Sequence, residues 1–166
     1  MTDFTKKILR TATTFLSLSL FGLAVVSGNT SRPFSLTIRP VQDVATAGSQ
    51  IHLQVVLTNT SDHDIGILKS APESDYIVDV RDSRGNVAPD TDFSRKQKDP
   101  ATVKVSVATP VYSLKPGESL RDEIQIERLY KISSPGRYNI QVSRIVPEEM
   151  GSGVVKSNTV NVTVTP

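Results

Sequence analysis

The sequence predicts an all-β protein, an antiparallel β-sandwich of seven to eight strands with an N-terminal signal peptide before it. Three observations support this prediction. Apolar residues recur at every second position in one segment after another, turn-forming residues separate these segments, and no segment after the leader has the period of an amphipathic helix. Because neighbouring side chains of a strand point to opposite faces, such alternation buries one face of each strand.

The first residues of the chain follow a different pattern from the rest. A basic start precedes an uncharged apolar run, and small residues follow that run, as in a secretory signal peptide. The basic and small residues concerned are Lys6, Lys7, Arg10, Ser27 and Gly28. We therefore expect residues 1–28 to be a signal peptide and residues 29–166 to be the folded domain, in a protein that is exported to the periplasm or the extracellular space.

The apolar part of the leader is shorter than the roughly 18 residues that a membrane-spanning helix needs. No membrane span is therefore expected after processing, although an uncleaved leader that stays as an anchor is the open alternative.

The chain has 19 Lys plus Arg and 17 Asp plus Glu, and the leader holds three of the bases and Asp3, which leaves 16 of each sign. A domain without net charge gives no reason to expect a nucleic-acid partner.

The predicted strands follow one another along residues 34–40, 50–59, 75–82, 102–114, 120–129, 137–146 and 159–166. Each has a row of apolar residues that should point into the core. These rows are Phe34, Leu36 and Ile38; Ile51, Leu53, Val55 and Leu57; Tyr76, Val78 and Val80; Val103, Val105 and Val107; Leu120, Ile124 and Ile126; Tyr138, Ile140 and Val142; and Val160, Val162 and Val164. Pro110 indicates an edge position or a break in the fourth strand, because proline cannot donate to the ladder.

Turn residues separate these strands at residues 46–50, 59–64, 82–86, 115–119 and 133–137. The last turn contains Pro135 and Gly136, and Tyr138 follows at the start of the next strand. This arrangement resembles the tyrosine corner of immunoglobulin-like domains, in which the phenol donates to upstream backbone. We therefore expect Tyr138 to have a structural role.

Residues 114–120, 129–144 and 154–164 together resemble bacterial immunoglobulin-like domains, including the intracellular proteinase inhibitor of Bacillus. The resemblance covers residues 33–166 and implies an immunoglobulin-like β-sandwich. No inhibitory residue can be transferred onto this chain, and the predicted export differs from an intracellular inhibitor.

Residues 89–101 are predicted to form a long irregular loop, which contains Phe93, Arg95, Lys96 and Lys98. Long loops on a rigid sandwich often carry binding sites, although a solvated loop without a special role is the alternative. The leading hypothesis is a non-catalytic module that binds another protein through this loop or an exposed strand edge. A proteinase inhibitor that presents the basic residues 93–98 is the second hypothesis, and a hydrolase is the third.

Few residues support catalysis or metal binding. The chain has no cysteine and two histidines, His52 and His63, and no serine lies in a G-x-S-x-G motif. Acidic turns at residues 62–64 and 90–92 offer oxygen ligands for calcium, but carboxylates are also favoured in turns because they accept from nearby backbone. We expect no enzyme activity, no metal site and no cofactor.

Overall fold

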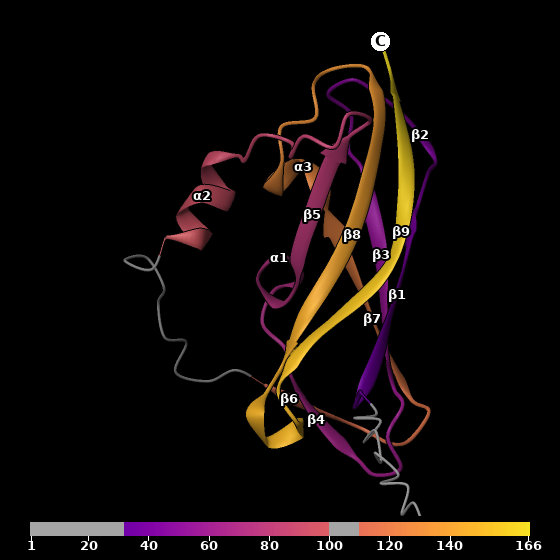
Figure 1. The fold of residues 1–166 in the computed structure, drawn as a ribbon, viewed down its shortest axis with the longest axis vertical. Coiled ribbons are helices and arrows are strands. Elements are labelled where there is room, and N and C mark those ends of the chain that lie inside the picture. Colours follow the sequence, from indigo (N-terminus) through magenta and orange to yellow (C-terminus); the bar gives the residue numbers. More distant parts are fainter. Residues whose placement is uncertain (1–31, 100–109) are drawn as a thin grey trace, which may run out of the picture.

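The computed structural model describes residues 32–99 and 110–166, which form a β-sandwich (Figure 1). One sheet has the strand order β1-β3-β7, and the other has the order β2-β9-β8-β5. A short third sheet pairs β4 with β6. The strands are β1 (Phe34–Pro40), β2 (Val44–Thr46), β3 (His52–Asn59), β4 (Ile65–Leu68), β5 (Ile77–Asp82), β6 (Val111–Leu114), β7 (Ser119–Gln125), β8 (Gly136–Val146) and β9 (Gly153–Thr165). The predicted β-sandwich is confirmed.

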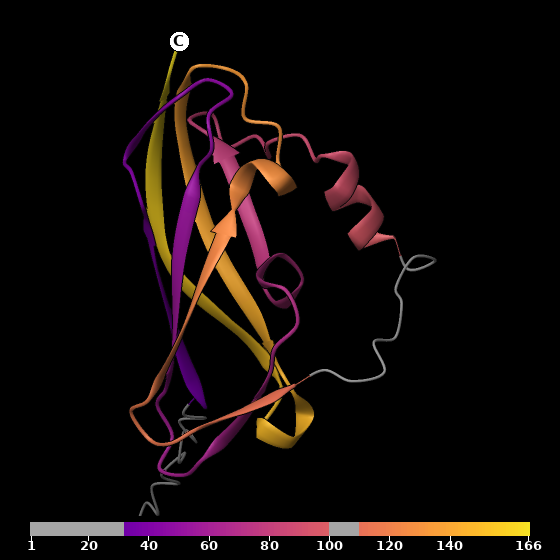
Figure 2. The ribbon, with the colours of Figure 1, turned by 180° about the vertical axis from the view of Figure 1, so that it is seen from behind.

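Short helical segments interrupt the strands, contrary to the expectation of no helix. They are α1 (Pro72–Asp75), α2 (Asp92–Lys98), α3 (Ile126–Leu129) and the 3-10 turn η2 (Glu148–Met150). In Figure 2, α3 directly continues β7 on the near side of the sandwich. Ile126 was expected on a strand and belongs instead to α3, where it is fully buried. None of the helices among the described residues is long and apolar enough to cross a membrane.

The core is built from the alternating rows that the sequence predicts. In β3, Leu53, Val55 and Leu57 have no exposed surface, while the residues between them are partly exposed. Ile140 and Val162 of the other sheet are also buried, and all five residues belong to one apolar cluster. Full burial of such side chains stabilises the fold by about 1.5–3 kcal/mol each. The predicted inward residues Leu120 and Val160 are partly exposed and lie at the edge of this cluster.

Two predicted features lie outside the described residues. These are the signal peptide, residues 1–28, and the part of the fourth predicted strand that carries Val103, Val105 and Val107. The end of that segment, after Pro110, is strand β6, which pairs with β4. The sandwich also contains one parallel strand pair, β2 with β9, where only antiparallel pairs were expected.

The parallel pair arises because the first part of the chain changes sheets. β1 pairs with β3 and ends at Pro40, and β2 begins at Val44 in the opposite sheet. An irregularity in the β8–β9 ladder lies beside this crossing, where the backbone amide of Val142 donates to the Ser157 hydroxyl at 3.0 Å. The adjacent Asn158 side chain accepts from the amide of Ile38 at 2.8 Å and donates to the Ile38 carbonyl at 3.0 Å. Asn158 thereby satisfies the edge of β1 and joins the two sheets.

The turn before β8 has a hydrogen bond of the kind found in a tyrosine corner. The Tyr138 hydroxyl donates to the Ser134 carbonyl at 2.9 Å, across the Pro135–Gly136 step. Gly136 has a φ of 151°, a conformation that other residues rarely adopt. This bond ties the start of β8 to the turn that precedes it.

Candidate functional site

The predicted binding loop is a helix over most of its length. Residues 92–98 form α2, which begins after Thr91, whose side chain accepts from the Ser94 amide at 3.1 Å. An aspartate in the first turn and basic residues in the last turn complement the helix dipole. The expectation of an irregular segment at residues 89–101 is therefore wrong for residues 92–98, because the N-cap and the charge pattern favour a helix.

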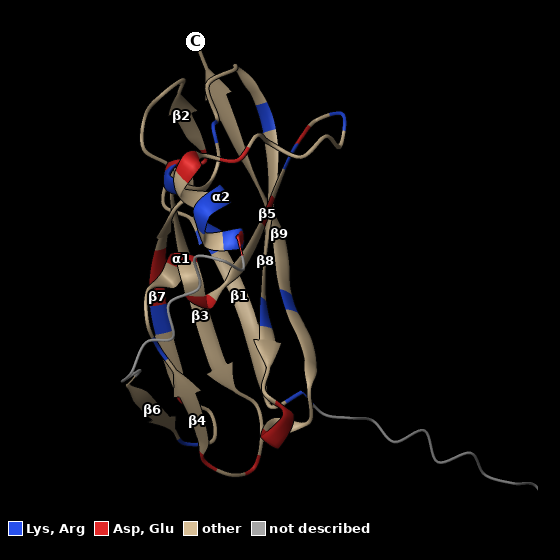
Figure 3. Ribbon diagram, turned by 90° about the vertical axis from the view of Figure 1, so that its left-hand side faces the viewer, with Lys and Arg blue, Asp and Glu red and all other residues tan. Residues whose placement is uncertain are grey.

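The basic residues of α2 interact with neighbouring groups of the same chain. Arg95 pairs with Asp92, and Lys98 Nζ lies 2.6 Å from Asp90 Oδ1. Figure 3 shows this mixture of basic and acidic residues around α2. Phe93 is exposed, and the Arg128 guanidinium lies 4.9 Å from the centre of its ring. Much of the positive charge of α2 is thus balanced within the molecule.

The titration of Asp90 reflects this pairing. Partial burial acts to raise the pKa of Asp90, but hydrogen bonds from Lys98 and Ser94 and the charges of Lys98 and Arg95 outweigh it and lower the pKa. Burial likewise opposes the shift at Lys98, whose pKa is raised by its contacts with Asp90 and Tyr130. Both groups are therefore charged at neutral pH, and their ion pair links the last turn of α2 to the residue before its N-cap.

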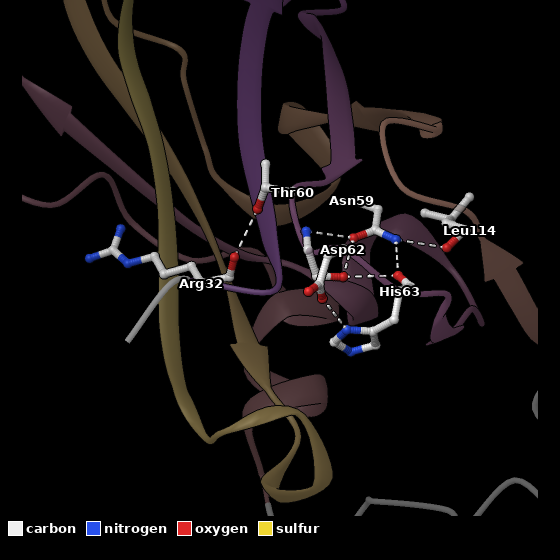
Figure 4. Close-up of polar contacts among 7 residues, drawn as sticks. Arg32, Asn59, Thr60, Asp62, His63 and Leu114 are labelled. Carbon is white, nitrogen blue, oxygen red and sulfur yellow. Dashed lines mark hydrogen bonds and ion pairs between the residues drawn. The ribbon is translucent and has the colours of Figure 1, made fainter. Parts of the chain in front are cut away.

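The acidic turns bind neighbouring protein groups. Figure 4 shows the turn after β3, where His63 Nδ1 lies 2.8 Å from Asp62 Oδ1 and both side chains are largely exposed. Asn59 is the buried centre of this turn. Residues 32–99 and 110–166 contain no group of three or more acidic or histidine side chains placed to hold a metal ion.

The two histidines have acidic neighbours. His52 Nδ1 lies 2.5 Å from Glu123 Oε1 on the outer face of β3 and β7, and His63 contacts Asp62. Among residues 32–99 and 110–166, neither imidazole ring has a serine or threonine hydroxyl as a hydrogen-bond partner. The arrangement gives no support to a nucleophilic triad.

A cleft of about 390 Å³ opens where β4, α1, the start of β5 and the end of β8 meet. Its walls are mainly apolar, and the charged side chains among them are Asp75 and Arg144. Three large apolar residues of this wall, Leu68, Ile77 and Ile145, are each at least half exposed, and we call them the cleft rim. Exposed apolar side chains that gather at a concave site mark a binding surface more often than scattered ones do.

Two further exposed valines extend the cleft rim across the neighbouring strands. Val111 of β6 is the cross-strand partner of Leu68, and Val154 of β9 is the partner of Ile145. The apolar surface therefore runs from the β4–β6 sheet to the lower ends of β8 and β9, which Figure 1 shows close to one another.

Arg144 lies at the inner side of the cleft and is 9% exposed. Its Nη2 donates to the Leu68 carbonyl, and its guanidinium carbon lies 5.1 Å from the centre of the Tyr76 ring. Its Nη1 is buried and has no hydrogen-bond partner. A buried guanidinium with an unpaired nitrogen is costly, so this group is the most unusual feature of the described residues.

Two other charged residues complete the polar cluster around Arg144. Asp122 is buried, accepts from the Tyr76 hydroxyl at 2.7 Å, and forms an ion pair with Lys69 at 2.7 Å. Burial raises the pKa of Tyr76, and the hydrogen bond to Asp122 and its negative charge raise it further, so the phenol remains a neutral donor. The cluster contains two cations and one carboxylate.

The sequence indicates this cluster through charged residues at inward strand positions and not through a sequence motif. Arg144 continues the inward row of Tyr138, Ile140 and Val142, and Asp122 lies between Leu120 and Ile124 in another inward row. Lys69 similarly continues the row of Ile65 and Ile67. A charged residue at an inward position must find a partner in the folded chain, so three such positions indicate a buried polar cluster.

No protein-family model matches this sequence, and the search of curated proteins finds no match either. Among solved structures, the CARDB domain of a Pyrococcus furiosus protein in complex with di-metal ions is 15% identical, with a TM-score of 0.41, and the match covers 80% of this chain and 87% of that one. A mutant β-glucosidase from Listeria innocua in complex with laminaribiose is 16% identical, and a β-glucosidase from Erythrobacter marinus is 13% identical. Both have TM-scores of 0.39, and each match covers 80% of this chain and 16% of the β-glucosidase. Likeness at this level carries no argument about the site.

Proposed function

We propose that this protein is an exported, non-catalytic, immunoglobulin-like module that binds another protein through the cleft between β4, α1, β5 and β8. The observation that carries the proposal is the cleft rim, where Leu68, Ile77 and Ile145 expose apolar surface around one concave site. Protein interfaces use such apolar centres with a polar surround. The basic leader and apolar run of residues 1–28 support the export part of the proposal.

Binding through α2 is the weaker alternative for the same function. The paired charges of Arg95 and Lys98 would have to be released before they contact a partner. The helical backbone of residues 92–98 also weighs against a proteinase inhibitor, because a loop that is offered to a protease cleft needs an accessible extended backbone. The cleft rim needs no such rearrangement.

Site-specific photo-cross-linking tests the binding surface. A photoreactive amino acid at Ile77, at the cleft rim, should give a covalent adduct with a partner protein in cells that produce the full chain. Val87 is the matched control, because it is as exposed as Ile77 and does not line the cleft. Equal adducts from both positions, or none from Ile77, would refute binding at the cleft.

The mass of the native protein tests export. Loss of residues 1–28, with recovery of the protein from the periplasm or the medium, is the expected result. An intact N-terminus on protein found in the cytoplasm would refute export and leave the binding surface to be judged by the cross-linking.

A further inference from the structure

We propose that the cleft binds the C-terminal end of the partner polypeptide, with the terminal carboxylate on Arg144 and the last side chain, an apolar one, against the cleft rim. This inference rests on the proposed function, because it names the part of the partner that the same cleft recognises. It depends on the charge of the polar cluster, the position of Arg144 beside the rim and the shape of a chain terminus.

The carboxylates near the cleft already accept hydrogen bonds or form ion pairs with other groups of this chain. Both oxygens of Asp122 have partners, Tyr76 at one and Lys69 at the other. Asp75, which also lines the cleft, accepts from the Ser70 amide at both oxygens, at 3.1 and 3.0 Å. Arg144 has no ion pair among the described residues, so its positive charge is complementary to an anion from outside the chain.

The guanidinium lies beside the apolar rim at Leu68. Arg144 donates to the backbone carbonyl of Leu68, and both residues line the cleft together with Ile77. A ligand that contacts both must therefore carry a carboxylate and an apolar group close together. Arg is well suited to such a carboxylate because its planar fork donates two parallel hydrogen bonds.

A chain terminus meets this requirement better than an internal acidic residue does. In an extended segment, side chains of successive residues point to opposite sides, so an internal Asp or Glu and its apolar neighbour diverge. At a C-terminus the carboxylate and the last side chain are attached to the same Cα. Capture of a terminal carboxylate is a recurring mode of peptide recognition.

Access to Nη1 requires a local movement, because this atom has no exposed surface in the free protein. Met150 lines the cleft and is partly buried against the core. Its unbranched thioether side chain can change rotamer at low cost, as methionines at adaptable binding surfaces do. We infer that the carboxylate reaches Arg144 when a cleft side chain such as that of Met150 changes its rotamer.

Peptide titration of the full chain tests the inference. The probes are four N-acetylated tetrapeptides that end in Leu, Ile, Val or Phe, each as the free acid and as the C-terminal amide, followed by calorimetry or NMR. At least one free acid should bind. Its amide should bind at least about tenfold more weakly, which is the factor expected for the loss of a charge-assisted hydrogen bond. The same peptide with a C-terminal glycine should also bind more weakly. Absence of binding by every free acid, or equal binding by acid and amide, would overturn the inference.

A pair of charge variants locates the contact. Arg144→Gln should remove the difference between acid and amide, whereas Arg39→Gln, on the exposed face of the other sheet next to Gln54, should preserve it. If Arg144→Gln does not fold, the comparison of acid, amide and glycine peptides on the unaltered protein still tests the inference.

Octanoate serves as a further probe, because it carries a carboxylate and an apolar chain without a peptide backbone. Octanoate that displaces the peptide at an equal or lower concentration would overturn the peptide assignment in favour of an apolar carboxylate.

The two proposals fail in different ways. An Ile77 adduct with a partner, together with equal binding of acid and amide, would leave the proposed function intact and remove the C-terminal assignment. Absence of any Ile77 adduct would remove the proposed function whatever the peptides do, and with it the partner to which the inference refers.

Discussion

Replacement of Asn59 by alanine is expected to destabilise the protein although this residue lies in a turn region far from the centre of the core. Asn59 is 1% exposed and ends β3. Figure 4 shows Asn59 between His63 and Leu114, and its Nδ2 donates to the carbonyls of both residues at 2.8 Å. Its Oδ1 accepts from the amide and hydroxyl of Ser61, at 2.9 and 2.7 Å. Alanine supplies none of these four hydrogen bonds.

The magnitude follows from which groups can find another partner. The His63 carbonyl keeps the Ser61 hydroxyl as a donor at 2.9 Å, so its loss is small. The hydrogen bond to Leu114 is buried, and removal of such a donor costs about 2 kcal/mol, while the two groups of Ser61 lose about 1 kcal/mol together because they reach water. We expect a loss of about 3 kcal/mol in the free energy of unfolding, or about 10 °C in Tm for a domain of this size.

Urea unfolding followed by far-ultraviolet circular dichroism measures this loss, with the unfolding slope compared between proteins to verify that the same surface is exposed. Ser61→Ala is the matched control, since it removes only hydrogen bonds of a hydroxyl at the surface of the turn and should cost less than about 1 kcal/mol. A cost for Asn59→Ala that is no greater than that of Ser61→Ala would refute the argument that the buried Leu114 bond dominates.

Three further changes test other parts of the fold. Tyr138→Phe removes the hydrogen bond to Ser134 and should cost about 1 kcal/mol in urea unfolding, and an unchanged midpoint would contradict a stabilising role for this corner. Asp122→Ala leaves the partly buried Lys69 ammonium and the buried Tyr76 hydroxyl without their partner and should cost about 3 kcal/mol or more, so a loss below 1 kcal/mol would show that the cluster relaxes freely. Asp90→Asn should destabilise by less than about 1 kcal/mol at neutral pH, because the pair with Lys98 is partly exposed. The lowered pKa of Asp90 means that its stabilisation is present above the ordinary value of 3.8 and is lost as the pH falls through the folded value, so the two proteins should converge in acid, and a constant difference would contradict the sign.

The helical segments show where sequence patterns are too short to interpret. α1 and α3 have four residues each, about one turn, so the 3.6-residue period cannot appear in them. α2 is longer and has recognisable signals, since Thr91 is an N-cap residue, Asp92 lies in the first turn and Lys98 in the last. These signals were available in the sequence, but a segment without an apolar stripe gives no periodicity to support them.

The candidate site was harder to predict than the core for a physical reason. The residues of α2 could be proposed as a binding loop because the length and the basic residues of one continuous segment can be read from the sequence. The cleft depends on Leu68, Ile77 and Ile145, which lie on three strands and become neighbours only after the sheets form. Arg144 was visible as a charge on an inward row, but its unpaired nitrogen depends on which carboxylates the fold brings near it.

The sequence alone determined the strand rows, because burial of alternate side chains is a local property of an extended chain with one face in the core. Leu53, Val55 and Leu57 follow that rule without reference to any distant residue. Only the tertiary structure decided the change of sheet between β1 and β2, the parallel pairing of β2 with β9, and the meeting of Lys69, Asp122 and Arg144. These arrangements join segments that are far apart in the chain, and their energies come from contacts that exist only once the two sheets have packed.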